Sequence, residues 1–188
     1  YIHNRIGGIM ITIDGGTGVV TGGTGGHGLR SPGSIVQTIQ TVKTDTDTIG
    51  TTDTFTDISG LSATITPTST TSKVLVMVNL SMSGPDQQSI SWKILRGSTP
   101  VYIGDAAGSN RIRVAGSSRI CDGGDAETMN CTSIFLDSPS TTSSTTYKIQ
   151  WARPYPVGQC YLNRPSEDSD VNDRARTPSS ILLQEVAA

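Results

Sequence analysis

The stretch Lys73-Val-Leu-Val-Met-Val-Asn-Leu-Ser-Met-Ser83 decides the predicted fold. Every second residue from Val74 to Met82 is apolar, and this period of two indicates a β-strand with one face in a core. The opposite face begins with Leu75 and Met77 and then turns polar, so we expect the start of the strand to be covered on both sides.

The same kind of pattern extends in both directions along the chain. Further segments rich in Val, Ile, Thr and aromatic residues are separated by turn residues such as Gly84-Pro85. No apolar residues recur at helical spacing over a dozen positions. The sequence therefore predicts an all-β protein, an antiparallel β-sandwich and more specifically a jelly roll. The other predicted strands are 34–44, 51–58, 61–66, 89–96, 100–103, 111–115, 129–137, 145–152, 159–163 and 179–186.

Residues 1–33 predict an extended N-terminal arm rather than part of the sandwich. Paired glycines recur through this segment, so it cannot build a core of its own. Pro32-Gly33 marks the boundary, and 34–188 form the predicted sandwich domain. We expect the arm to be held by other proteins of an assembly.

Charge and composition exclude several classes of function. The formal net charge is -2, and no basic stripe marks a nucleic-acid binder. No apolar run approaches the roughly 18 residues that cross a bilayer, so a membrane is not an expected partner either. His3 and His27 are the two histidines, which excludes a Ser-His-Asp site within the sandwich unless the arm supplies the base.

The predicted core is lean for a chain of 188 residues, with two Trp and two Phe. A sandwich with so few large side chains gains stability by burying a second face against copies of itself. We therefore expect a homo-oligomer.

The three cysteines, Cys121, Cys131 and Cys160, lack the spacing of a zinc site. A Cys121–Cys131 disulfide would be open to the protein in an oxidising medium. The favoured interpretation is that Cys131 and Cys160 are small buried side chains on strands and that Cys121 is a loop thiol.

Two acidic loops are candidates for calcium binding, since hard cations take oxygen ligands. The first holds Asp122, Asp125 and Glu127 beside flexible glycines. Neither loop fits the twelve-residue calcium-loop pattern, and turn acids paired with nearby arginines are favoured. No cofactor is predicted. The acids of the second loop are Glu167, Asp168, Asp170 and Asp173, and its arginines are Arg164, Arg174 and Arg176.

Several stretches resemble the β-rich body of structural fibre proteins of tailed bacteriophages, including those that infect cyanobacteria. The resemblance implies a virion component, often trimeric, and brings no catalytic motif. The stretches are Ile11-Thr-Ile-Asp-Gly-Gly-Thr-Gly18, Gly33-Ser-Ile-Val-Gln-Thr-Ile-Gln40, Leu61-Ser-Ala-Thr-Ile-Thr-Pro-Thr-Ser-Thr-Thr-Ser-Lys-Val-Leu-Val-Met-Val78, Phe135-Leu-Asp-Ser-Pro-Ser-Thr-Thr-Ser-Ser-Thr-Thr-Tyr-Lys-Ile-Gln-Trp151 and Ser180-Ile-Leu-Leu-Gln-Glu-Val186.

The leading hypothesis is a non-enzymatic virion protein, a homotrimeric tail or head fibre that residues 1–33 attach to other virion proteins. Its loops would contact a glycan of the host surface, through weak sites multiplied by copy number. Ordinary turn residues are the alternative for each candidate contact residue. These candidates are Tyr102, Asp105, Asn110, Tyr155 and Asn163.

Three other functions stay open. A capsid-decorating (cement) protein would lay the arm across neighbouring shell subunits. A polysaccharide-cleaving enzyme would use a pair of carboxylates, with Asp122 or Asp168 as candidates. A secreted lectin-like module would need a signal peptide, for which the apolar stretch 9–13 is too short.

Overall fold

The computed structural model describes residues 2–6, 9–13, 20–22, 31–50, 52–84, 89–119, 127–154 and 158–188. Every regular element within these ranges is a β-strand, which confirms the predicted all-β class. Among the described residues, no helix is long and apolar enough to cross a membrane.

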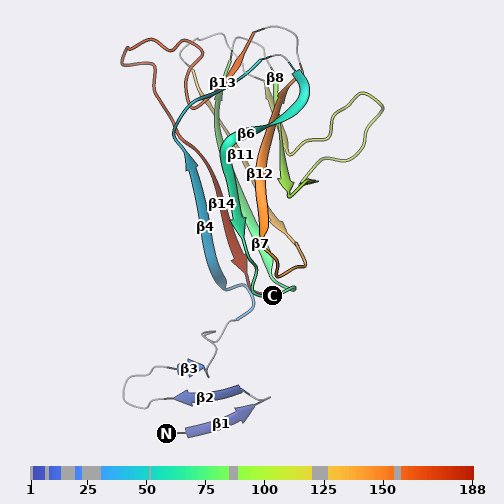
Figure 1. The fold of residues 1–188 in the computed structure, drawn as a ribbon, viewed down its shortest axis with the longest axis vertical. Helices are drawn as coiled ribbons and strands as arrows, with labels where there is room; N and C mark the ends of the chain where they lie inside the picture. The colour runs from blue at the N-terminus through green and yellow to red at the C-terminus, as the bar shows by residue number, and fades with distance from the viewer. Residues whose placement is uncertain are drawn as a thin grey trace.

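Three strands lie within the predicted arm, where the sequence predicted none. β1 (Ile2–Ile6), β2 (Ile9–Ile13) and β3 (Val20–Gly22) form a small antiparallel sheet in the order β1-β2-β3. Figure 1 shows this sheet below the sandwich, on the side where β4 begins.

The body consists of two sheets, each named here after a central strand. The β7 sheet has β4 (Ile35–Lys43), β14 (Ser179–Val186), β7 (Lys73–Ser83) and β11 (Met129–Asp137) as its long strands. Two short strands, β5 (Asp47–Ile49) and β13 (Cys160–Leu162), extend it past the ends of β4 and β14.

The second sheet, the β8 sheet, packs face to face with the first (Figure 1). Its strands are β6 (Thr52–Ile65), β12 (Thr145–Arg153), β8 (Ser89–Arg96) and β10 (Gly116–Arg119), in that spatial order. β9 (Thr99–Val101) pairs with the later part of β8, and β10 pairs with its start.

The pairing of the eight main strands is nested and antiparallel throughout. β4 pairs with β14, β6 with β12, β7 with β11, and β8 with β10. The first strand thus lies beside the last and the fourth beside the fifth, which is the topology of a jelly roll. The predicted fold class is confirmed.

The core lies between the sheets and follows the predicted alternation. β7 contributes the buried residues Val74, Val76, Val78, Leu80 and Met82. The facing sheet contributes the two tryptophans, Trp92 and Trp151, from adjacent positions of β8 and β12. Other fully buried apolar side chains are Leu61, Ile65, Ile90, Ile94, Ile149, Ile181 and Leu183.

Three predicted strand segments were wrong. One strand, β6 (Thr52–Ile65), takes the place of the two predicted strands 51–58 and 61–66, because Gly60 takes a left-handed backbone (φ 75°) and the ladder shifts register between Lys148 and Gln150. Such a bulge adds residues without ending the strand. The segment 111–115 is a loop, and the strand β10 follows it.

Candidate functional site

A long loop, residues 102–115, joins β9 to β10 and stands out from the flank of the sandwich (Figure 1). Tyr102 opens the loop with a left-handed backbone (φ 52°), and its ring stacks on Phe135 of β11 with centroids 4.7 Å apart. Arg113 Nε donates a hydrogen bond to the Gly104 carbonyl oxygen (2.7 Å). The start and the end of the loop are therefore both tied down.

Residues 110–114 of the loop and the outer face of the β8 sheet line a shallow hollow of about 450 Å³ that is open to solvent. Asn110 and Arg111 supply an amide and a guanidinium, and Ser89, Ser91 and Ser117 supply hydroxyl groups. The apolar part of the lining is Ile112, Val114 and Pro154.

Two serine hydroxyl groups of the lining are hydrogen-bonded within the described part of the protein, whereas the loop side chains Asn110 and Arg111 are not. Ser91 Oγ donates to Ser117 Oγ (3.0 Å), which donates to the Ile90 carbonyl oxygen (3.3 Å). Asn110 and Arg111 are exposed, and neither has a hydrogen-bond or ion-pair partner among the described residues. The one charge in the lining is thus a guanidinium with its donors open to solvent.

This lining matches the chemistry of an acidic sugar. A guanidinium pairs with a carboxylate through two parallel hydrogen bonds, and serine hydroxyl and asparagine amide groups pair with sugar hydroxyls. The apolar side chains offer a surface for the C–H face of a ring, and small-molecule sites combine apolar walls with a few polar groups in this way.

The predicted contact residues have different fates. Asn110 lines the hollow, whereas Asp105 is exposed elsewhere in the same loop and Tyr102 stacks on Phe135 at the start of the loop. Tyr155 lies outside the described residues, directly after Pro154 of the lining.

The prediction for Asn163 was wrong, because its side chain is completely buried. Nδ2 donates to the carbonyl oxygens of Lys43 and Asp45, both at 2.9 Å. Oδ1 accepts from Ser179 Oγ (2.6 Å), and the backbone N–H donates to the Ser81 oxygen (2.9 Å). Asn163 therefore joins three segments of the β7 sheet and has no group left for a ligand.

No group of three or more metal-ligating side chains exists within the described ranges. Asp122 and Asp125 lie outside those ranges, and Glu127 is exposed. The prediction of a metal site there stays a prediction.

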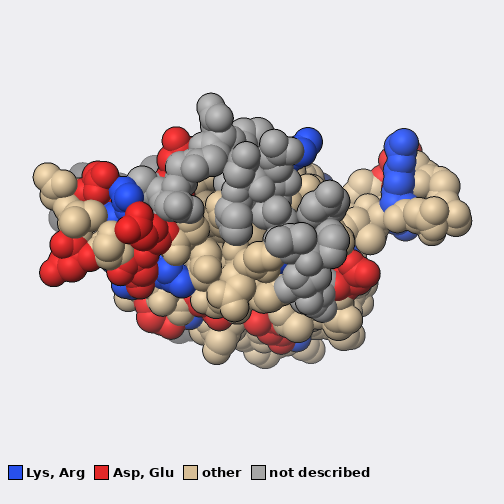
Figure 2. Space-filling view, turned by 90° about the horizontal axis from the view of Figure 1, so that it is seen from above, with Lys and Arg blue, Asp and Glu red and all other residues tan. Residues whose placement is uncertain are grey.

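The second acidic loop carries ion pairs, as the favoured interpretation expected. Arg174 contacts Glu167 (2.7 Å) and Asp173 (2.8 Å). Arg176 Nη2 contacts both carboxylate oxygens of Asp168 at 2.6 and 2.7 Å. The hydrogen bond from Arg174 lowers the pKa of Glu167. Figure 2 shows acidic and basic side chains interleaved on the projecting segment at the left of the molecule.

The cysteine prediction is confirmed for two of the three residues. Cys131 and Cys160 are buried free thiols on β11 and β13. Burial raises the pKa of both thiols, that of Cys160 to about 11. Cys121 lies outside the described residues, so the alternative of a Cys121–Cys131 disulfide stays a prediction.

Several lining residues of the hollow escaped sequence reasoning. Arg111 directly follows the candidate Asn110 in the sequence. Its positive charge in a long loop was the signal that could have identified it as a site residue. The serine residues of β8 and β10 carry no local signal, since they meet the loop only through the fold.

Comparison with known proteins shows no family for this chain. No protein-family model and no curated protein matches the chain. A solved structure of the Gt strain of infectious bursal disease virus has a TM-score of 0.43 at 13% identity, covering 96% of this chain and 44% of the other.

Two further solved structures give similar values. For the Gx strain of the same virus the TM-score is 0.41 at 14% identity, with 94% of this chain and 42% of the other covered. For the VP2 subviral particle of infectious bursal disease virus it is 0.38 at 12% identity, with 98% and 44% covered. The chain spans less than half the length of each of these proteins.

Proposed function

We propose that the protein is a non-enzymatic structural component of a virus particle, a tail or head fibre attached by residues 1–33. In this proposal the hollow beside the 102–115 loop contacts an acidic glycan of the host surface. The resemblance to bacteriophage fibre proteins supports the structural role, and the lining of the hollow supports the ligand class.

The arrangement of attachment and hollow is the observation that carries the proposal. Gly33 N–H donates to the Ala187 oxygen (2.8 Å), and Ala187 N–H donates to the Ser34 oxygen (2.9 Å). The arm therefore leaves the sandwich at the end where β14 also finishes, while the 102–115 loop stands on the flank (Figure 1). Attachment through the arm leaves the hollow open to solvent.

The hollow is shallow and offers one charge, so a single copy would bind a sugar with low affinity. Several copies on one particle would raise the overall affinity by binding together, without any new contact. A fibre in a homotrimer, or in many copies on a particle, meets this requirement.

The carboxylates of the second acidic loop support a structural rather than a catalytic role. A glycosidase needs one carboxylic acid that can release its proton to a leaving group. Both carboxylate oxygens of Asp168 instead accept hydrogen bonds from Arg176 Nη2, at 2.6 and 2.7 Å, so this side chain is already engaged within its own loop. Asp122, the other candidate, lies outside the described residues.

Immunogold imaging of purified particles of the virus that encodes this chain tests the structural role. Serum raised against the full chain should label the tail or long projections. Uniform label over the head would favour the capsid-decorating alternative instead. Absence of label on both intact and disrupted particles would contradict the proposal.

A further inference from the structure

The outer faces of the two sheets differ in their charge. On the β8 sheet, Lys148 Nζ lies 2.7 Å from Asp57, which also accepts a hydrogen bond from Gln150 Nε2 (2.7 Å). Lys93 Nζ stands 3.9 Å above the ring of Phe55. Charged groups that are paired on the surface in this way suit a face in contact with water.

The β7 sheet has an apolar outer face instead. Met77 is the register partner of Leu182 on one side and of Ile134 on the other, and Leu75 is the partner of Leu136. Register partners on adjacent strands point to the same face. These five side chains therefore form one continuous surface, the β11 patch, across β14, β7 and β11.

The outward residues of β11 in the β11 patch are exposed, unlike the inward residues of the same strand. Ile134 and Leu136 keep 55% and 49% of their surface accessible, while the alternate residues of the same strand, Cys131 and Ser133, are buried. The surrounding outward positions, Asn79, Thr132, Ser180 and Gln184, are polar and uncharged.

Charge is almost absent from this face. Of the outward residues of β7, β11 and β14, Lys73 alone is charged, and it lies at the end of β7 opposite Val186. An apolar centre within a neutral polar rim is the anatomy of a protein–protein interface, in which charged residues are depleted.

We infer that the β11 patch is buried against the same patch of a second copy of this chain. A partner surface that carries charge would lose the solvation of that charge on contact with the patch, without a counter-charge to replace it. A second copy supplies a face of matching character, and symmetric assemblies bring equivalent patches together around their axis. The net charge of -2 per chain opposes this contact little.

The position of the β11 patch at the edge of the β7 sheet also favours a second copy of the chain as its partner. β11 is the outermost strand of the β7 sheet, and no other described strand pairs with its free edge. Exposed edges of this length tend to pair with other chains unless they are covered. The inference goes beyond the proposed function and is independent of any glycan at the hollow.

Sedimentation of the full chain over a wide dilution series tests the inference. The unmodified protein should have the mass of several chains, and Ile134→Lys should weaken the association roughly a hundredfold. Val171→Lys is the matched control, because Val171 is also half-exposed (51%) but lies in the loop before β14. This control should associate like the unmodified protein.

The mass of a single chain at every concentration would overturn the inference and leave the patch to a different protein. Equal association of Ile134→Lys and the unmodified protein would overturn it as well.

Oxidative footprinting of the unmodified chain decides the question even if Ile134→Lys fails to fold. Met77 lies in the patch, whereas Met129 points to the inner face of β11 and contacts Ser118. As the protein concentration rises, the oxidation rate of Met77 should fall while that of Met129 stays constant. A rate for Met77 that is independent of concentration would contradict self-association through this face.

Discussion

Gly116 lies directly against the indole ring of Trp92, its register partner on β8. A Cβ atom at position 116 would overlap the six-membered part of that ring. The indole is fixed from its other side, because Trp92 Nε1 donates to Ser133 Oγ of the opposite sheet at 3.0 Å. The ring therefore fills the space between β10 and β11 and cannot move away from residue 116.

Gly116→Ala should lower the free energy of unfolding by about 1–3 kcal/mol, since overfilling a packed core forces side chains or backbone to shift. Urea unfolding followed by tryptophan fluorescence measures the change. Gly104→Ala is the matched control, because no atom lies within 4 Å of its added Cβ. Equal stability of the two variants would show that Trp92 has another position available.

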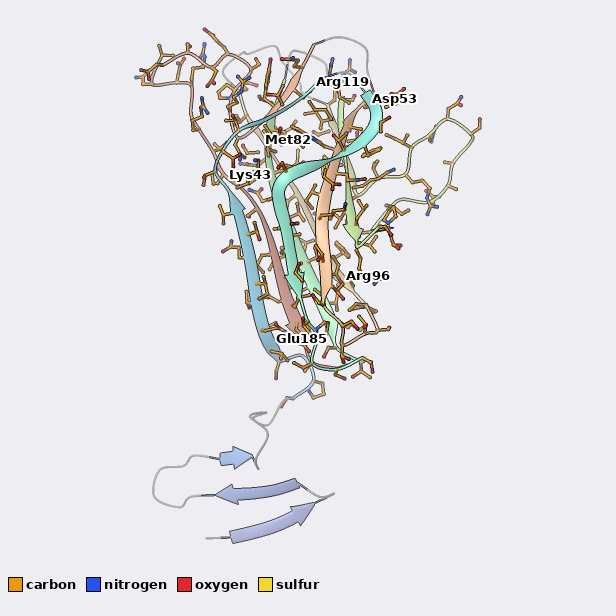
Figure 3. All side chains as sticks on the ribbon, viewed as in Figure 1. Lys43, Asp53, Met82, Arg96, Arg119 and Glu185 are labelled. Atoms are coloured by element: carbon orange, nitrogen blue, oxygen red, sulfur yellow. The ribbon has the colours of Figure 1, made fainter. Side chains whose placement is uncertain are left out.

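Glu185 should stabilise the protein most at neutral pH. The carboxylate is buried near the end of the sandwich where the arm joins (Figure 3). Burial alone would raise its pKa, but hydrogen bonds from Thr68 N–H (2.8 Å), Thr68 Oγ1 (2.6 Å) and Gln37 Nε2 (2.6 Å) outweigh this and lower the pKa to about 2. The ionised form therefore holds the turn before β7 against β14.

A folded-state pKa below the ordinary value means that this stabilisation is complete above about pH 4.5 and is lost as the pH falls towards 2. Glu185→Gln should cost about 1–3 kcal/mol at neutral pH, because an amide N–H₂ then faces donors. The difference from the unmodified protein should shrink in acid. The exposed Glu127→Gln, as control, should change stability little at any pH; a constant deficit of Glu185→Gln would contradict the assignment.

Asn163 should contribute through both its side chain and its backbone. Asn163→Ala removes hydrogen bonds to Lys43, Asp45 and Ser179 and keeps a Cβ at a left-handed position (φ 63°). We expect a loss of about 3 kcal/mol in thermal or urea unfolding. Asn163→Gly removes the same bonds without the backbone cost, and should be about 1 kcal/mol more stable than the alanine variant. Identical values would show that the left-handed backbone costs nothing there.

Arg111 should control binding at the hollow. On an array of neutral and carboxylated glycans, the full chain should prefer the carboxylated ones, and added salt should weaken binding. Arg111→Ala should reduce that binding at least about tenfold, since a charge-assisted pair is lost. Lys73→Ala removes an equal charge from the β7 sheet and should bind like the unmodified protein. Equal loss in both variants would mean that net charge, and not the hollow, attracts the glycan.

Strands whose alternation reflects a single buried face were predictable to the residue. Lys73–Ser83, Met129–Asp137 and Ser179–Val186 have the bounds that their patterns indicated. The segment 111–115 failed for an instructive reason, because Ile112 and Val114 alternate as in a strand but line the hollow instead of a core. Alternation alone therefore does not distinguish a strand with one face in a core from a loop whose apolar side chains line a surface hollow.

The candidate site was only partly predictable for the same reason. Asn110 and Arg111 share one loop, whereas Ser89 lies on β8 and Pro154 directly follows β12. Asn163 is the last residue of the predicted strand 159–163, a position from which the burial of its side chain could not be inferred. Its burial depends on Lys43 and Ser179, which lie far away in the sequence.

The nested strand order also sets when the protein can fold. Ile181 and Leu183 of β14 are the register partners of Val78 and Val76, and Gly33 and Ala187 are hydrogen-bonded to each other. During translation the edge of β7 that pairs with β14 therefore stays unpaired until β14 has left the ribosome. Contacts between such distant parts of a chain form slowly, and uncovered strands invite aggregation meanwhile. The β7 sheet can therefore be completed only once β14 has been synthesised.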